Sequence, residues 1–201
     1  MSEPAFMLTT TLMRHPVTTC EAVQSIDVRV SRVRWASSEA TSGLALTYTL
    51  VGDCSRLRIP VSGPPARADG LWQHTCFEVF IAVADKAGYG EWNFAPSGNW
   101  ATYQFRGYRD RELSAQDAPP PQLVWRATAQ RLELDARFCL PPRFVDRPLR
   151  LALSAVIEDH LGKLSYWALR HPPGKPDFHH ADGFALEIAP LPKEIAKKDL
   201  R

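Results

Sequence analysis

The residues His74, Cys76 and Glu78 occupy alternate positions of one stretch, where they could act together. Alternate side chains of a β-strand point to the same face, so these groups would share it with the rings of Trp72 and Phe80. A nucleophile with its base is one interpretation. Such residues lie roughly 7 Å apart, however, whereas a thiol–imidazole hydrogen bond needs about 3 Å. We therefore interpret this face as a binding surface, which combines apolar area with a few polar groups that orient a ligand.

The opposite face of the same stretch is apolar, since Phe77, Val79 and Ile81 alternate with the polar set. This pattern predicts a strand from Leu71 to Val83 that packs its apolar side on a core. Glu78 must then point to the other side of the sheet, where a carboxylate needs water or a hydrogen-bond donor, because burying it alone costs several kcal/mol. We predict that Trp72 and Glu78 lie on the same side of one strand and face a cavity that holds a polar ligand. The alternative is a structural salt bridge between Glu78 and an arginine. No GxSxG, HExxH or paired-carboxylate signature is present, so we assign no catalytic residue.

The loop HPPGKPDFHHADG, residues 171–183, gathers three histidines and two aspartates. Adjacent histidines in an extended chain point to opposite sides, so a metal ion could use only one of His179 and His180, and we assign no metal site. Prolines stiffen the loop, and Gly174 permits a tight turn. We predict that the loop covers part of the cavity and forms its rim. The polar groups of this rim would be Arg170, Lys175, Asp177 and His179.

Alternation of apolar and polar residues runs through most of the chain, and no stretch of about twelve residues keeps a helical 3.6-residue period. About ten short strands joined by Pro, Gly and Asp loops are typical of a β-sandwich or jelly roll. We predict one all-β domain, an antiparallel β-sandwich, over residues 26–189, with an N-terminal arm (1–25) and a basic C-terminal tail (190–201). The stretch 71–109 lies at its centre, because it holds ten of the chain's twenty aromatic residues.

Three local features are predicted more closely. Residues 26–35 change phase near Ser31 and Arg32, which indicates a β-bulge. Residues 123–129 and 132–138 are expected to pair as a hairpin across a tight turn near Gln130. Further strands are expected at residues 44–50, 149–159, 164–171 and 183–189.

Composition narrows the function classes. The formal charge of +2 is too small, and the basic residues outside the tail too scattered, for a nucleic-acid-binding surface. The chain lacks a run of about 18 apolar residues, and its first twenty residues lack a continuous apolar segment, so we expect neither membrane insertion nor export. Four cysteines without a CxxC pair are expected to be reduced thiols of a cytoplasmic protein.

Several runs together carry a resemblance to a known family: WQHTCFEVFIA, residues 92–98 and 100–108, and SYWALRHPPGKPDFHHADGFALEI. Over residues 26–188 the chain resembles the DOMON-like domains related to family-9 carbohydrate-binding modules, in a short bacterial branch. The resemblance implies an antiparallel β-sandwich that binds sugars or haem. The sugar-binding pattern often has an Asp two or three residues before the Glu of its EVF segment, where this chain has Thr75 and Cys76.

A sugar ring could stack on tryptophan, because an indole offers large apolar area to the C–H side of a pyranose. The candidates are Trp72, Trp92, Trp100 and Trp167, each of which could instead fill the core. Trp72 and Trp167 are favoured because they fall on the face opposite to their strand's most apolar residues. Hydroxyl groups would be bound by His74, Glu78, Asn93 and Glu158. We expect a non-catalytic domain for a small carbohydrate-like ligand, such as a sugar nucleotide, a cell-wall precursor or a sugar phosphate, whose phosphate Lys175 and Arg170 could meet.

Two alternatives from other classes stay open. The first is a haem-binding redox module, although all methionines lie in the N-terminal arm, so only ligation by His74 and a loop histidine would serve. The second is a hydrolase that uses Glu78 or Glu158 with a histidine. No cofactor is otherwise expected, and the sequence leaves the ligand and the oligomeric state open.

Overall fold

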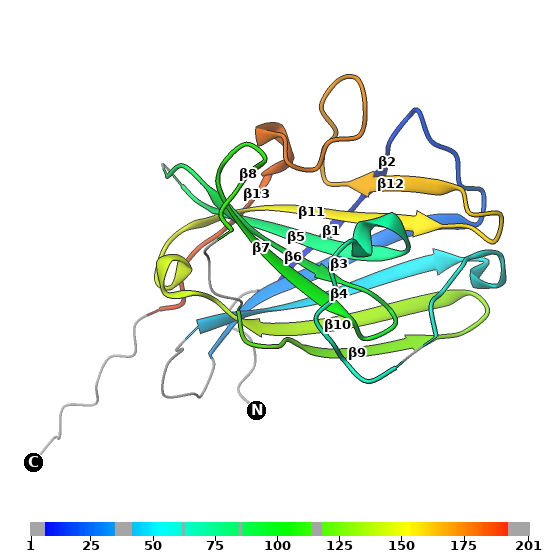
Figure 1. Ribbon diagram of the computed structural model, residues 1–201, viewed down its shortest axis with the longest axis horizontal. Coiled ribbons are helices and arrows are strands. Elements are labelled where there is room, and N and C mark those ends of the chain that lie inside the picture. The colour runs from blue at the N-terminus through cyan, green and yellow to red at the C-terminus, as the bar shows by residue number, and fades with distance from the viewer. Residues whose placement is uncertain (1–6, 35–41, 62, 85, 114–117, 193–201) are drawn as a thin grey trace, which may run out of the picture.

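The computed structural model describes residues 7–34, 42–61, 63–84, 86–113 and 118–192. These residues form two antiparallel sheets (Figure 1). The smaller sheet has the order β1 (Met7–Thr11), β3 (Val23–Arg34), β4 (Ser42–Gly52), β10 (Arg131–Cys139) and β9 (Gln122–Ala127). The larger sheet has the order β2 (Met13–Arg14), β12 (Leu164–Ala168), β11 (Leu149–Glu158), β5 (Cys76–Val83), β6 (Tyr89–Phe94), β7 (Trp100–Gly107) and β8 (Asp110–Arg111).

A last strand and four short 3₁₀ turns complete the architecture. Strand β13 (Leu186–Ile188) also pairs with β11. The turns are η1 (Cys54–Arg56), η2 (Leu71–Gln73), η3 (Pro142–Phe144) and η4 (Ala181–Gly183). The described residues contain no α-helix, and therefore none that could cross a bilayer. The predicted all-β antiparallel sandwich is confirmed.

The core lies between the two sheets, where alternate residues of both sheets meet. From β5 it takes Phe77, Val79 and Ile81, as the alternation predicted. A fully buried tyrosine, Tyr48 of β4, reaches across from the smaller sheet and donates a hydrogen bond of 2.6 Å to the backbone carbonyl of Glu78. This bond satisfies the buried hydroxyl and fixes β5 against β4.

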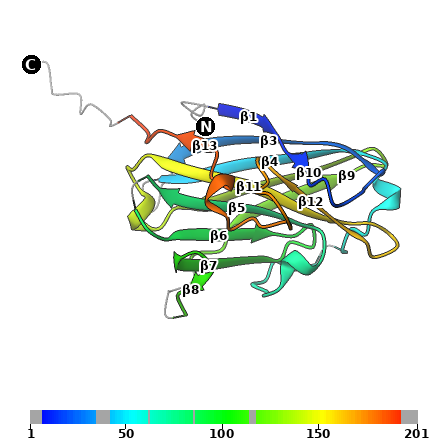
Figure 2. The same ribbon diagram turned by 90° about the horizontal axis from the view of Figure 1, so that it is seen from above.

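The larger sheet carries the central stretch of the sequence. Figure 2 shows β11, β5, β6, β7 and β8 one after another across this sheet. Strand β5 begins at Cys76, later than the predicted start at Leu71, because Gly70 adopts φ +77° and residues 71–73 form the η2 turn. The side chain of Trp72 therefore belongs to a turn at the strand's entrance and not to the strand.

Pairing in β3 contradicts the predicted bulge. The register between β3 and β4 is continuous from Ser25 to Arg34, and the only shift in this ladder lies between Val23 and Ser25. Arg32 occupies an inward position in phase with the apolar residues before it, and its guanidinium donates to the carbonyl of Arg147. The apolar alternation of residues 26–35 has an apparent change of phase because Arg32, a charged residue, occupies an inward position. Residue Trp35, at the end of that prediction, lies outside the described residues.

The hairpin of β9 and β10 is confirmed, with Ala127, Trp125 and Leu123 opposite Leu132, Leu134 and Ala136. Strand β11 also matches its predicted bounds to one residue, whereas β12 and β13 are shorter than predicted.

The residues predicted as an N-terminal arm include two strands of the sandwich. Strand β1 pairs with β3 of the smaller sheet, and β2 pairs with β12 of the larger sheet. Leu12 lies between them and is buried in the core. Residues 7–14 therefore join the two sheets.

Candidate functional site

The outer face of the larger sheet carries a second apolar cluster, separate from the core. Its buried members are Phe80, Tyr89, Ala101, Tyr103, Phe105, Ala152 and Phe184. Because Phe77, Val79 and Ile81 face the core, the alternation of β5 directs Phe80 to the outside. The segment between β12 and β13 covers part of this face through Phe178 and Phe184. Strands β5 to β7 are thus buried on both sides.

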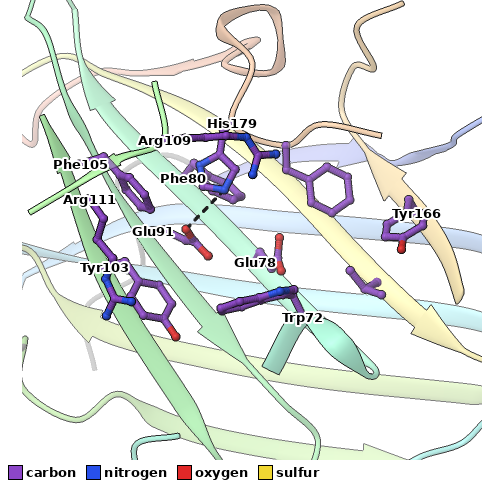
Figure 3. Close-up of a pocket in the computed structure, with 12 residues that line it drawn as sticks. Trp72, Glu78, Phe80, Glu91, Tyr103, Phe105, Arg109, Arg111, Tyr166 and His179 are labelled. Atoms are coloured by element: carbon purple, nitrogen blue, oxygen red, sulfur yellow. Dashed lines mark ion pairs between the residues drawn. The ribbon is translucent and has the colours of Figure 1, made fainter. Parts of the chain in front are cut away.

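This cluster surrounds a pocket of about 370 Å³ (Figure 3). Twelve residues line it: Trp72, Glu78, Phe80, Glu91, Tyr103, Phe105, Arg109, Arg111, Val156, Tyr166, Phe178 and His179. Strands β5, β6, β7, β8, β11 and β12 contribute residues to it, together with the η2 turn and the segment after β12. Six of the residues are aromatic, apart from the imidazole, so the pocket combines apolar walls with few polar groups, as small-molecule sites do.

Glu78 lies at the bottom of the pocket with only 2% of its surface exposed. Its Oε2 accepts a hydrogen bond of 3.0 Å from the hydroxyl of Ser154 on β11. Burial raises the pKa of Glu78 to about 8, and the charge of Glu91 acts in the same direction. The carboxyl group is therefore largely protonated at neutral pH, as a buried acid without a cationic partner should be.

A second buried carboxyl group, that of Glu91, faces the same space (Figure 3). In the register of β5 and β6, Glu78 lies opposite Asn93 and Glu91 lies opposite Phe80, so the two acids are diagonal neighbours on one face. The Asn93 amide donates a hydrogen bond of 2.7 Å to Oε1 of Glu91. Burial raises the pKa of Glu91 to about 7, although this amide and the charges of Arg111 and Arg109 act in the opposite direction.

Two arginines lie at the side of the pocket, and each has its own partner. Arg109 forms an ion pair of 2.8 Å with Asp177, which also accepts a hydrogen bond of 2.6 Å from Tyr108. The guanidinium of Arg111 lies over the ring of Tyr103, 4.2 Å from its centroid, in a cation–π arrangement. Neither arginine forms an ion pair with Glu78 or Glu91 within the described residues.

His179 closes one side of the pocket against the aromatic cluster. Its Nδ1 lies 2.8 Å from the Tyr89 hydroxyl, and its Nε2 lies 3.9 Å from Oε2 of Glu91. Burial, and then the charge of Arg109, lower the pKa of His179 to about 4, so the ring is neutral at pH 7. The Tyr89 hydroxyl accepts a hydrogen bond from the backbone N–H of Arg109. In the arrangement in which Tyr89 donates to Nδ1, the imidazole proton lies on Nε2 and faces Glu91.

Trp72 forms the opposite side of the pocket and is the most accessible of its rings. It is 43% exposed and makes an edge-on contact with Tyr103, at a centroid distance of 5.8 Å. Figure 3 shows the indole lying beside Glu78, with His179 across the pocket from it. An exposed indole of this kind offers a face to an incoming ligand.

The structure brings together part of the predicted site. Trp72, Glu78 and His179 line the pocket. Asn93 and Asp177 stand directly behind lining residues, since Asn93 binds Glu91 and Asp177 binds Arg109.

Three of the four predicted tryptophans lie in the core instead, so we remove them from the candidate site. Trp92 stacks on Phe138 between the sheets, in space that Gly90 leaves open. Trp100 is likewise a core residue. Trp167 faces inward and donates a hydrogen bond of 3.0 Å to Ser165, while its neighbour Tyr166 lines the pocket. The apolar alternation of β12 was therefore assigned to the wrong side.

The remaining predicted residues lie away from the pocket lining. Glu158 is buried at the end of β11, where it binds Arg58 at 2.8 Å and Nδ1 of His74 at 2.7 Å. The side chain of His74 is 63% exposed. Arg170 and Lys175 are exposed and do not line the pocket. The carboxylate–histidine contact of the hydrolase alternative thus exists as the pair Glu158–His74, outside the pocket lining.

Sequence reasoning missed several lining residues, above all Glu91 and the two arginines after β7. A signal for Glu91 was present, because it stands in the otherwise uncharged run YGEWNF of β6. A charged residue inside a fully buried strand must be paired or functional. The absence of a recognised paired-carboxylate motif was therefore misleading, because the two acids come from neighbouring strands. Among the described residues, no group of three His, Cys, Asp or Glu side chains could hold a metal ion.

Comparison with known proteins identifies related folds but no family. No family model matches the chain, and no curated protein matches it in sequence. A candidate carbohydrate-binding protein from Bacteroides uniformis has a similar structure, with a TM-score of 0.59 and 11% identity over 87% of this chain and 82% of that one. A family-9 carbohydrate-binding module from Caldicellulosiruptor kristjanssonii in complex with glucose gives a TM-score of 0.49, with 11% identity over 89% of this chain and 82% of that one. At such identity, the likeness to the first shows a shared β-sandwich fold.

Proposed function

We propose that the protein binds a small carbohydrate in the pocket on the outer face of its larger sheet. The observation that carries this proposal is the combination of one exposed indole, Trp72, with two buried carboxyl groups, Glu78 and Glu91, around a common space. Aromatic rings suit the apolar face of a sugar, and carboxyl groups suit its hydroxyls. The fold shared with a candidate carbohydrate-binding protein supports the same class of ligand.

The pocket assigns a role to each kind of side chain. Trp72 and Tyr103 provide a corner into which a pyranose ring can pack. Glu78 and Glu91 can accept hydrogen bonds from hydroxyls when ionised and donate one when protonated. Arg109 and Arg111 form the polar edge of the opening. No covalent step is proposed, because the arrangement accounts for binding without one.

The test is a thermal-shift and calorimetric screen with neutral and charged monosaccharides, sugar phosphates and sugar nucleotides. A ligand that binds only the folded protein raises its melting temperature by mass action. Trp72→Ala should weaken binding of the best ligand by about tenfold or more, which corresponds to about 1.4 kcal/mol. Val124→Ala, an exposed position on β9 of the other sheet, is the matched control and should leave affinity unchanged.

Two outcomes would contradict the proposal. One is a screen in which no carbohydrate raises the melting temperature. The other is a Trp72→Ala variant that binds the best ligand as tightly as the unmodified protein. Haemin belongs in the same screen, since a Soret band on titration would favour the redox alternative instead.

A further inference from the structure

Neither acid of the pocket forms an ion pair with a Lys or Arg side chain of the described residues. Within the described residues, Glu78 receives one hydrogen bond, from Ser154 to Oε2, and no donor contacts its Oε1. Among the described residues, no hydrogen bond is formed to Oε2 of Glu91, and the imidazole 3.9 Å from it, that of His179, is neutral at pH 7. Two buried carboxyl groups therefore face the pocket with acceptor capacity that the protein does not use.

The two arginines that line the pocket, Arg109 and Arg111, contact other residues. Arg109 is held by Asp177 and Tyr108, and Arg111 stacks on Tyr103. Moving either arginine toward the acids would break these contacts. The negative charge of the pair is therefore compensated at present by bound protons.

Aromatic rings surround the same space. Trp72, Tyr103, Phe80, Phe105, Tyr166 and Phe178 line the pocket. The faces of such rings attract cations, and the attraction is stronger where water is excluded. A positively charged group that enters the pocket would thus meet unused carboxylate oxygens and aromatic walls together. A neutral ligand would leave the protons on the acids and would gain nothing from their charge.

We propose that the ligand is an amino sugar with a free, protonated amine, which Glu78 and Glu91 bind as a pair. This inference rests on the proposed carbohydrate function and names its ligand class. The bound ammonium group favours the ionised form of the carboxyl groups that it contacts, so binding below the pKa values of the pair releases protons to solvent. N-acetylation removes the positive charge and should abolish this advantage.

The experiment is isothermal titration calorimetry at pH 6.5 with three probes: glucosamine, glucose and N-acetylglucosamine. Each titration is repeated in two buffers of different ionisation enthalpy, so that proton release is measured separately from affinity. We expect glucosamine to bind at least tenfold more tightly than glucose, with release of close to one proton per ligand. Glu78→Gln should remove the preference for glucosamine, while Glu187→Gln, an exposed position on β13, should retain it.

Each result decides between the two proposals. If glucose binds as tightly as glucosamine, or if glucosamine binds without proton release, the inference of a protonated amine is wrong. The proposal of carbohydrate binding is then still supported. Absence of binding by all three probes overturns the amino-sugar inference, and the wider carbohydrate screen then decides the proposed function. If Glu78→Gln does not fold, Glu91→Gln replaces it with the same expected loss of preference, and a retained preference in that variant overturns the inference.

Discussion

At the scale of one residue, the burial of Glu78 makes the stability of the fold depend on whether its carboxyl group is protonated. Its pKa of about 8 in the folded protein lies above the ordinary value of 4.5. The stabilisation from that proton is therefore fully present below about pH 4.5 and is lost as the pH rises through 8. We expect the free energy of unfolding to fall between pH 5 and pH 9, by an amount of the order of a few kcal/mol. Urea denaturation at pH 5, 7 and 9 measures this fall.

Glu78→Gln keeps the shape of the side chain and removes its titration. The variant should lose less stability than the unmodified protein between pH 5 and pH 9, because Glu91 is then the remaining carboxyl group of the pocket with a raised pKa. The contribution of His179, which has the opposite sign, is the same in both proteins. Glu187→Gln should keep the full fall. Equal pH dependence in all three proteins would show that Glu78 does not hold its proton in the folded state. In the part of the chain that the structure describes, Glu78 has a hydroxyl partner, that of Ser154, and not the arginine that a structural ion pair would need.

The sequence predicted which face of a strand a site residue occupies only where apolar and polar residues alternate without interruption. Glu78 was placed on the correct face because Phe77, Val79 and Ile81 determine the phase of β5. Trp167 was misplaced because the outer face of β12 carries the apolar residues Leu164, Tyr166 and Ala168. The core face pairs Trp167 with the polar Ser165, so the alternation indicated the wrong side. Glu91 was missed because its partner lies on a different strand, and pairing between strands depends on a register that one sequence does not display.

At the scale of elements, the segment between β12 and β13 is held over the pocket by Asp177. This carboxylate accepts hydrogen bonds from Tyr108, Arg109 and the backbone N–H of His179. These bonds hold the pKa of Asp177 below its ordinary value despite its partial burial, so its contribution is lost only as the pH falls through that lowered value. Asp177 therefore connects the β7–β8 turn with the segment between β12 and β13 that covers the pocket.

We predict that Asp177→Ala releases this segment while leaving the sandwich intact. Amide hydrogen exchange of residues 177–183 should become at least tenfold faster, because opening would no longer break the three hydrogen bonds. Exchange in β5 and β11 should be unchanged. Lys175→Ala, an exposed substitution in the same segment, is the control and should exchange as the unmodified protein does. Unchanged exchange in Asp177→Ala would mean that aromatic packing alone holds the segment.

At the scale of the whole molecule, the predicted division into an arm, a sandwich and a tail was based on apolar alternation. Residues with clear alternation were assigned to the sandwich, and the remaining residues to the arm and the tail. The hairpin of β9 and β10 and the long strand β11 were predictable, because each buries one clean apolar face in the core. Strands β1 and β2 were not, because they are short, lie at sheet edges and expose most of their residues. Their place is determined by pairing with β3 and β12, which are distant in the sequence.

Leu12 tests whether residues 7–14 stabilise the sandwich as a whole. It lies between β1 and β2, is 2% exposed and packs into the core between the sheets. Leu12→Ala should lower the free energy of unfolding by about 2–5 kcal/mol, the range observed when buried leucines are truncated. Val17→Ala, at a position that is 66% exposed, should cost less than about 0.5 kcal/mol. Because one core holds both sheets, each variant should still unfold in a single transition when it is followed by far-ultraviolet circular dichroism and by tryptophan fluorescence. A small effect of Leu12→Ala, or two separate transitions, would mean that the N-terminal strands are an appendage and that the sandwich is complete without them.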